Sequence, residues 1–254
     1  MTSPYLGRPV SAWAKITQKL LALHPLTPDL ILEVAVASWD ALWSTRVGAG
    51  QTAISLNELS VPATVVGYFF EVLFAKEMER RFPAKWRGCQ QGGEKDLVYL
   101  PDPDDSVEIK ASGQLGLKVF GNRSYGQKVQ NQALAKKEKS GFYITVNFFK
   151  TSLTLIRFGW IDASDWKPQA SPTGQMAGLS DDVYRYKLVP ISGSYELQAP
   201  VGILPGIGFK MAADLAVKGI TTVGDFLRFK GSLPAKLSRL RDEIRPSHEW
   251  EQSP

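Results

Sequence analysis

The strongest constraint on the fold is a change of sequence pattern at Gly92-Gly93. Before this point, apolar residues recur three and four positions apart, which is typical of helices. After it come short runs rich in β-branched and aromatic residues, separated by turn residues, which is typical of strands. A helical first part followed by a β-rich second part predicts an α/β fold in which helices flank a mixed sheet.

The individual segments agree with this order. Thr27-Pro28-Asp29 is a helix start signal, because a cap hydroxyl precedes a proline at the first helical position. Helices are expected over residues 11–23, from residue 28 onward, over 61–82, and in the basic stretch QKVQNQALAKKEK at 127–139. Strands are expected over KDLVYL, VEIKAS, GFYITVNFF and LTLIRFGWID. The stretch PDPDDS between the first two strands suits a turn, so these strands should form a hairpin.

Length and composition narrow the class of protein. The 254 residues are enough for one large domain, or for a medium domain with a small satellite. Cys89 is the only cysteine, which excludes an internal disulfide and a cysteine-cluster zinc site. No apolar run is long enough to cross a bilayer, and the N-terminus lacks a secretory signal. We therefore expect a cytoplasmic protein with no membrane partner.

The positive charge of the chain is concentrated in one stretch. Residues 113–140 contain six Lys or Arg residues and one acid, so their net charge equals the +5 of the whole chain. Such a stretch suits a phosphate backbone, and binding of this kind depends on salt. A solvated helix face is the alternative interpretation of the same run.

Two carboxylates and one lysine are expected to converge at the predicted hairpin. Glu108 and Lys110 lie two residues apart on a strand, so their side chains point to the same face. Asp96 begins the neighbouring strand and can lie beside them. Carboxylate oxygens suit a hard cation such as Mg²⁺, and the lysine can position or activate an attacking water. The alternative is an exposed hairpin with an ordinary cross-strand Glu–Lys pair.

This arrangement resembles the PD-(D/E)xK phosphodiesterases, with Asp96, Glu108 and Lys110 in the three motif positions. Those enzymes usually carry another acid on the preceding helix, and Glu71 in GYFFEVLF is placed to supply it. The resemblance implies catalytic roles for these four residues and metal ligands at Asp96, Glu108 and Ile109. It also implies the nuclease core fold, with a mixed sheet flanked by helices.

The family can be narrowed further on several uncommon strings that occur in the right order. These are GNRSYGQ at 121–127, KSGFYITVNF at 139–148, IRFGWIDASDW at 156–166 and SPTGQMAGL at 171–179. From about residue 39 to 188 the chain resembles the ScaI-like type II restriction endonucleases. This resemblance implies Mg²⁺-dependent cleavage of both strands of a short DNA site, usually by a homodimer in a restriction-modification system.

The last part of the chain is not associated with that family. Residues 198–254 resemble a small all-α helix-hairpin-helix domain, and we place a boundary near residue 195, after a nuclease domain over 1–195. Gly206, Ile207 and Gly208 form the predicted hairpin, whose backbone N–H groups and the adjacent Lys210 would contact a DNA phosphate without reading sequence. An ordinary helical pair joined by a glycine turn is the alternative.

A polar loop is predicted to follow the catalytic strand. It contains Asn122, Arg123, Gln127 and Lys128, whose side chains are of the types that read base edges or bind phosphates. A Gly-Asn turn with a solvated arginine is the alternative interpretation.

Other polar and aromatic residues are given structural interpretations. His24 and His248 lie at opposite ends of the chain and lack triad or zinc partners, so we predict structural or surface roles. Asp162 and Asp165 fit either a metal site or a capped turn. Trp160 and Trp166 are the two tryptophans that could stack on bases.

Two other function classes remain as alternatives to a restriction endonuclease. A structure-specific nuclease acting on branched or flapped DNA would also join this fold to helix-hairpin-helix motifs. Flap nucleases of that type carry an acid-Arg-Lys-x-x-x-Asp string, which this chain lacks. A DNA-binding protein with a decayed nuclease site is the third class, and the intact Asp96, Glu108 and Lys110 argue against it.

Overall fold

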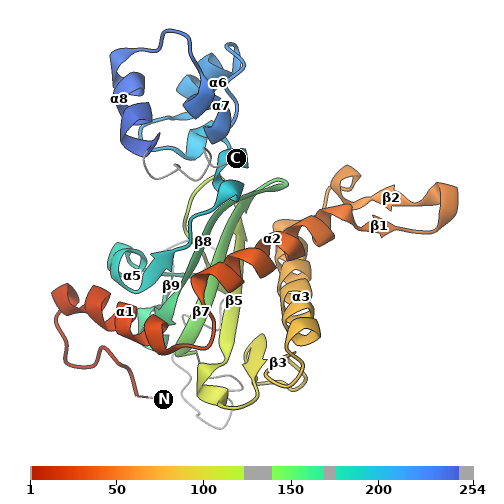
Figure 1. The fold of residues 1–254 in the computed structure, drawn as a ribbon, viewed down its shortest axis with the longest axis vertical. Helices are drawn as coiled ribbons and strands as arrows, with labels where there is room; N and C mark the ends of the chain where they lie inside the picture. Colours follow the sequence, from red (N-terminus) through yellow and green to blue (C-terminus); the bar gives the residue numbers. More distant parts are fainter. Residues whose placement is uncertain (1, 123–138, 169–175, 246–254) are drawn as a thin grey trace.

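The computed structural model describes residues 2–122, 139–168 and 176–245 (Figure 1). Its main body is built on a six-stranded sheet with the strand order β11-β8-β7-β5-β4-β3. The strands are β3 (Trp86–Gly88), β4 (Leu97–Tyr99), β5 (Val107–Gly113), β7 (Gly141–Phe149), β8 (Ser152–Ile161) and β11 (Leu188–Pro190). The predicted α/β class with a mixed sheet is confirmed.

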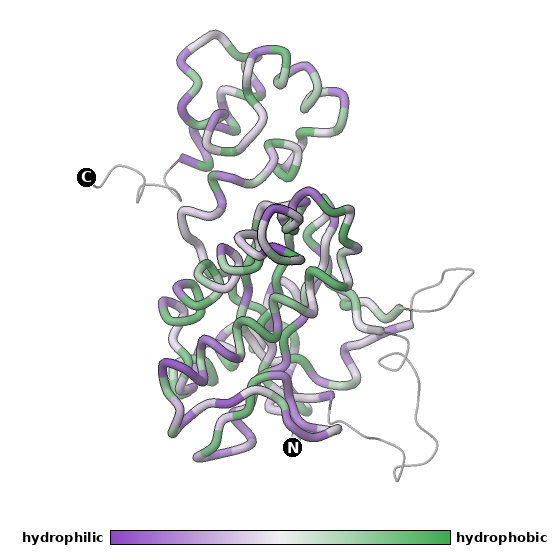
Figure 2. The backbone as a smooth tube through the Cα atoms, turned by 90° about the vertical axis from the view of Figure 1, so that its right-hand side faces the viewer, coloured by the Kyte–Doolittle hydropathy of each residue, from purple (hydrophilic) through white to green (hydrophobic). Residues whose placement is uncertain are grey.

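The register of the sheet explains its mixed character. Strand β5 pairs in parallel with β7, whereas every other neighbouring pair is antiparallel. The first eight residues of β7 are buried, because helices or loops cover both faces of this central strand. Its aromatic and β-branched residues fit a pleated surface covered on both sides. Figure 2 shows hydrophobic segments running through the middle of the main body.

Three helices cover one side of the sheet region: α1 (Trp13–Leu23), α2 (Pro28–Ser44) and α3 (Ala63–Arg81). The predicted start of α2 is confirmed, because the Thr27 hydroxyl accepts a hydrogen bond from the Leu30 N–H and Pro28 is the first helical residue. Helix α3 packs on β5 at close range. A Cβ added to Gly67 would lie 3.2 Å from the Ala111 Cβ, so the glycine permits this approach.

Two smaller sheets and a short helix complete the main body. Strands β1 (Arg46–Val47) and β2 (Ile54–Ser55) form a two-stranded arm that projects from it (Figure 1). The second small sheet has the order β6-β10-β9. Its strands are β6 (Gly121–Asn122), β9 (Lys167–Pro168) and β10 (Met176–Gly178), and helix α5 (Asp181–Tyr186) follows them. Most of the predicted helix at 127–139 lies outside the described residues.

The C-terminal helices are α6 (Phe209–Ala216), α7 (Val223–Arg228) and α8 (Ala235–Ile244). They enclose a hydrophobic cluster of their own, made of Val201, Ile207, Leu215, Ile220, Phe226 and Leu237. Thr222 caps α7 by accepting a hydrogen bond from the Asp225 N–H. The segment before the glycine hairpin is a single 3₁₀ turn, Val201–Ile203, rather than a full helix. Pro205 explains this, because a proline disfavours helical geometry at the residue before it.

No single helix in the described ranges is long and apolar enough to cross a membrane. Two consecutive helices, Val10–Leu23 and Pro28–Ser44, are together long and apolar enough for a membrane span, but the chain bends by 76° between them.

Candidate active site

The aspartate of the predicted cluster lies immediately before β4. Strands β4 and β5 are antiparallel, with Leu97 opposite Val107, and this pairing brings Asp96 beside β5. The Asp96 Oδ2 atom accepts a hydrogen bond of 2.8 Å from the Ile109 N–H. The backbone of β5 therefore fixes the position of this carboxylate.

The other two members of the cluster lie on β5. The Lys110 ammonium donates a hydrogen bond of 2.6 Å to Glu108 Oε1 and one of 3.1 Å to the Ile109 carbonyl oxygen. Its Nζ atom is also 3.7 Å from Asp96 Oδ2. Three oxygens from three residues thus surround one positive charge. We call Asp96, Glu108, Ile109 and Lys110 the β5 cluster.

The charges of the β5 cluster are largely removed from water. Glu108 is 1% exposed and the Lys110 side chain is 18% exposed. Burial by itself lowers the pKa of Lys110, but the opposite charges of Asp96 and Glu108 and the hydrogen bond to Glu108 outweigh it and raise that pKa above its ordinary value. Lys110 is therefore an ammonium at neutral pH and a counter-charge to both carboxylates.

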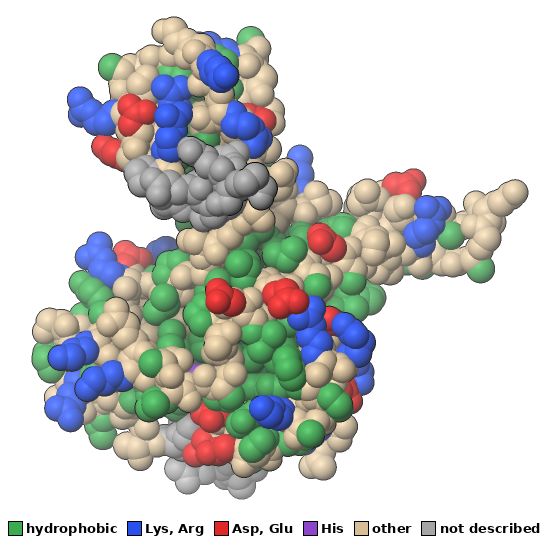
Figure 3. Space-filling model, in the orientation of Figure 1, with side chains coloured by type: hydrophobic (Ala, Val, Ile, Leu, Met, Phe, Trp, Pro, Cys, Tyr) green, Lys and Arg blue, Asp and Glu red, His purple; other side chains and the backbone are tan. Residues whose placement is uncertain are grey.

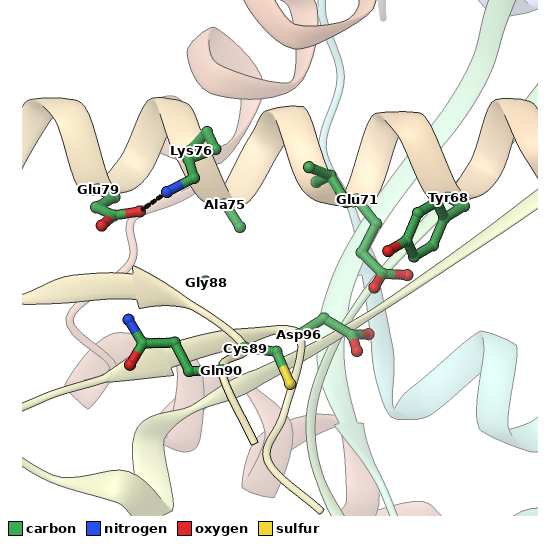
Figure 4. Close-up of a pocket in the computed structure, with 10 residues that line it drawn as sticks. Tyr68, Glu71, Ala75, Lys76, Glu79, Gly88, Cys89, Gln90 and Asp96 are labelled. Carbon is green, nitrogen blue, oxygen red and sulfur yellow. Dashed lines mark hydrogen bonds and ion pairs between the residues drawn. The ribbon is translucent and has the colours of Figure 1, made fainter. Parts of the chain in front are cut away.

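A pocket beside the β5 cluster lies between α3 and the β3–β4 edge of the sheet (Figure 4). Its volume is about 270 Å³. Glu71 on α3 and Asp96 both line it, and their carboxylates point into the same space (Figure 4). Tyr68, Cys89 and Gln90 also line the pocket, and sequence reasoning did not identify them. No sequence signal marks them, because the pocket forms only when α3 packs over the sheet edge.

The oxygens of the β5 cluster fit a hard divalent cation. Within the described ranges, no group of three or more His, Cys, Asp and Glu side chains is arranged to hold a metal ion. The three oxygens around the Lys110 ammonium are instead two carboxylates and one backbone carbonyl, and they already converge on a cationic point. Oxygen donors of these two kinds are those that Mg²⁺ and Ca²⁺ prefer.

The two neighbours of Asp96 in the chain have other roles. Glu94 forms a double hydrogen bond with Arg87, at 2.8 and 2.5 Å, which lowers the pKa of Glu94 to about 2. Lys95 donates a hydrogen bond of 3.0 Å to the Ser140 carbonyl and lies over the Tyr143 ring. Both residues therefore brace the turn and the sheet around Asp96.

The predicted DNA-contacting loop is mostly outside the described residues. This applies to Arg123, Gln127 and Lys128, and of Asn122 only the backbone is described, as part of β6. The residues of the predicted C-terminal hairpin, in contrast, lie within the described part of the chain. Gly206 has a φ of +78°, Ile207 is buried and Gly208 precedes α6, which contains Lys210.

A second carboxylate–lysine cluster explains Asp162 and Asp165. The Lys187 ammonium lies 2.8 Å from both Asp162 Oδ2 and Asp165 Oδ2, and the rings of Tyr5 and Trp13 cover it. The two aspartates also form a capping box, so the capped-turn interpretation is confirmed. We call Asp162, Asp165 and Lys187 the Lys187 cluster.

The structural roles of the buried aromatic residues are also clear. Trp160 is buried and donates a hydrogen bond of 2.9 Å to Asp162, and Trp166 is buried in a hydrophobic cluster, so neither is placed to stack on bases. The predicted structural role of His24 is confirmed. Its Nδ1 accepts from the Leu26 N–H, which leaves Nε2 as the donor to the Asp105 carbonyl. His248 lies outside the described residues.

Comparisons with known proteins identify the family. The model of the ScaI restriction endonuclease family matches residues 3–192, which include the whole β5 cluster and Glu71. The type II restriction enzyme ScaI of Streptomyces caespitosus is 36% identical over 197 residues, or 74% of this chain and 84% of that protein. No solved structure matches the chain. These matches confirm the resemblance seen in the sequence, and the chain belongs to the ScaI restriction endonuclease family.

Proposed function

We propose that this chain, a type II restriction enzyme homologue, uses a PD-(D/E)xK active site and Mg²⁺ to cut both strands of a short DNA site. The observation that supports the active site most directly is the β5 cluster, where Asp96, Glu108 and the Ile109 carbonyl surround one cationic point. The neighbouring pocket, lined by Glu71 and Asp96, gives a phosphodiester access to this edge of the sheet.

Each residue has a defined part in this proposal. Asp96, Glu108 and the Ile109 carbonyl would hold the ion, and Glu71 would act from α3 on the far side of the pocket. Bound Mg²⁺ polarises a phosphoryl oxygen and lowers the pKa of water. Lys110, as an ammonium, donates a hydrogen bond that orients the attacking water toward phosphorus. No protein side chain forms a covalent bond to DNA in this reaction.

The chemistry of the substrate supports a homodimer. A duplex presents two antiparallel strands, and one β5 cluster acts on one strand at a time. Two copies related by a two-fold axis would present one cluster to each strand, and the symmetry of the pair would match that of a palindromic site.

The direct test is digestion of plasmid and genomic DNA with Mg²⁺, followed by sequencing of the cut ends. Discrete fragments that end at one short sequence are expected. The same protein with Ca²⁺ in place of Mg²⁺ should bind that sequence without cutting it. Nicking that depends on a branch or flap, rather than on sequence, would instead favour the structure-specific nuclease.

We further propose that residues 198–254 form a separate helix-hairpin-helix domain that binds DNA phosphates without reading sequence, next to a nuclease domain over 1–195. The separate hydrophobic cluster of these helices supports this division, and the family match ends at residue 192. Lys and Arg side chains are visible on one face of this part of the chain (Figure 3). Backbone N–H groups at Gly206–Gly208 and Lys210 would contact one phosphate.

Substitution of Gly208 tests this contact more cleanly than substitution of Gly206. Gly206 has a φ of +78°, so valine there would strain the backbone, whereas a Cβ on Gly208 meets no atom within 4 Å. Gly208→Val with Lys210→Ala should weaken DNA binding at every sequence and keep the recognition site. Loss of the Lys210 contact should reduce the salt slope by about 0.9. Lys230→Ala is the control, because Lys230 is not among the residues that line the pocket beside Gly208 and Lys210.

A changed or relaxed cut site in the Gly208→Val, Lys210→Ala variant would show that the C-terminal helices read bases. Unchanged affinity at every salt concentration would show that the hairpin does not contact DNA.

A further inference from the structure

Six exposed apolar side chains lie on the β1–β2 arm, on the segment that follows it and on α3, and we propose that together they bind a second copy of the chain. The inference rests on the proposed function and adds the location of the contact between copies. We call these residues the arm–helix surface. They are 36–53% exposed and comprise Val47, Ile54, Leu59, Val65, Phe69 and Val72.

Helix α3 is apolar on two opposite sides. One side, which includes Val66, Phe70 and Phe74, is buried in the core of the main body. The opposite side carries Val65, Phe69 and Val72 at positions i, i+4 and i+7, which places them in one stripe. The first half of α3, residues 63–75, carries one charged side chain, Glu71. A helical segment that is apolar on two sides is normally covered on both, so the exposed stripe of α3 is a candidate surface for a partner.

The β1–β2 arm also carries exposed apolar side chains on one face. Val47 on β1 and Ile54 on β2 lie directly opposite each other in the antiparallel register, so their side chains share one face. A two-stranded hairpin alone in water is marginally stable. This one projects from the main body (Figures 1 and 3), where an apolar face can pack only on another molecule.

The chemistry of the surface favours a protein partner over DNA. Protein surfaces that bind DNA are strongly positively charged, whereas residues 46–75, which carry the arm–helix surface, contain one basic residue, Arg46, and two acids, Glu58 and Glu71. Its area is roughly 400 Å², if a fully exposed large apolar side chain presents about 150–250 Å². A standard interface buries about 800 Å² per partner, and about half of it is non-polar. The size thus fits the apolar part of a stable dimer.

The location favours a second copy over another protein. Val72 belongs to the stripe and also lines the pocket that contains Glu71 and Asp96. Pairing of two chains through α3 would therefore bring two pockets close to one two-fold axis. That proximity would let one dimer cut both strands at one site.

The first experiment measures the mass of the full-length protein by light scattering, without DNA or metal. Wild type should have twice the chain mass of 28.0 kDa. Phe69→Glu places a charge in the centre of the stripe and should raise the dimer dissociation constant at least tenfold. Leu23→Glu, at an 87% exposed apolar residue at the end of α1, is the matched control and should remain a dimer.

A second variant guards against misfolding. Val65→Glu lies one turn away on the same stripe, and circular dichroism with thermal melting identifies which variants are folded. A monomeric wild type, or folded Phe69→Glu and Val65→Glu proteins that both remain dimers, would overturn the inference.

Plasmid cleavage separates this inference from the proposed function. A folded monomeric variant keeps the β5 cluster, so it should nick supercoiled DNA and produce linear DNA only at high protein concentration. A wild-type dimer that cuts no DNA would contradict the proposed function and leave the interface supported. A wild-type monomer that linearises plasmid would contradict the interface and leave the nuclease assignment in place.

Discussion

The β5 cluster and the Lys187 cluster each contain two carboxylates and one lysine, but they differ in how far the lysine is exposed and in what lies beside it. In the β5 cluster, Lys110 contacts Asp96, Glu108 and a backbone carbonyl, and Asp96 lines the pocket. In the Lys187 cluster, the ammonium contacts Asp162 and Asp165 and is covered by the rings of Tyr5 and Trp13. The lysine side chains are 18% and 2% exposed, respectively.

The difference shows that residue types alone do not define a reaction site. Both clusters balance buried charge in a similar way. The Lys187 cluster joins the segment between β8 and β9 to the residue between α5 and β11, and the rings of Tyr5 and Trp13 cover its ammonium. The β5 cluster has an open side that faces Glu71. Both clusters contain acids and a lysine, so the neighbouring pocket is what makes the β5 cluster the candidate for chemistry.

The largest expected effect is the loss of cleavage when the β5 cluster is broken. Glu108→Ala removes a proposed ion ligand worth several kcal/mol at the transition state, so cleavage should fall at least about 10³-fold. Asp96→Ala and Lys110→Ala should have similar effects. DNA affinity should change little, because phosphate contacts elsewhere provide most of it. The readout is the rate of plasmid cleavage with Mg²⁺.

Glu33→Ala is the control for these variants, since Glu33 lies on α2 and pairs with Arg81, away from the β5 cluster. It should retain most of the activity. A Glu108→Ala protein that cuts near the wild-type rate would remove the basis for the active-site assignment.

The next effect is a loss of stability when the Lys187 cluster is broken. Lys187→Ala leaves two buried carboxylates without their counter-charge, which should cost about 3–5 kcal/mol of unfolding free energy. Urea denaturation measures this loss. Cleavage per folded molecule should be unchanged, because the Lys187 cluster does not line the pocket. If Lys187→Ala instead abolished cleavage in a fully folded protein, the contrast between the two clusters would fail.

The sequence predicted the β5 cluster, but it did not decide between a metal site and a capped turn for Asp162 and Asp165. Glu108 and Lys110 are two residues apart on one strand, so their common face follows from strand geometry. Asp96 is one hairpin away, which is also a local relation. Lys187 is more than 20 residues from Asp162 and Asp165, and nothing in the local pattern connects them. The capped-turn alternative was therefore correct but could not be selected from sequence.

The same reasoning explains the other differences between sequence and structure. The α2 cap at Thr27 was predictable because it involves only neighbouring residues. The β1–β2 arm was not predicted, because two-residue strands in a Gly- and Thr-rich stretch are defined by their partner rather than by a pattern. The segment Val201–Ile203 before the predicted hairpin is a single 3₁₀ turn, because Pro205 disfavours helical geometry at the residue before it.

A smaller effect concerns pH and a buried titratable group outside the pocket, His24. Burial lowers the pKa of His24 from 6.5 to about 4, although hydrogen bonds to Asp105 and Leu26 oppose this. The unfolded chain therefore binds the proton first, and stability should fall as pH decreases from about 6.5 to 4, by up to about 3 kcal/mol. His24→Gln keeps a donor for the Asp105 carbonyl and does not titrate.

The measurement for His24 is urea denaturation at several pH values between 7 and 4. The decline should be shallower in His24→Gln than in wild type. Parallel curves for the two proteins would show that His24 is not the group responsible.

The smallest effect sharpens the comparison by asking which cluster can exchange its lysine for a metal ion. In the β5 cluster the Lys110 ammonium occupies the point on which three oxygens converge, so a cation must displace it. Lys110→Met removes this competitor and leaves a net negative site beside an open pocket. Calorimetry should then show Ca²⁺ binding about tenfold tighter than in wild type, or about 1.4 kcal/mol. Lys187→Met also frees two carboxylates, but Tyr5 and Trp13 close that site, so it should bind no additional Ca²⁺. Equal Ca²⁺ binding by the two variants would mean that access does not distinguish the clusters. Weaker Ca²⁺ binding by Lys110→Met than by wild type would mean that the Lys110 ammonium organises the three oxygens rather than competing for them.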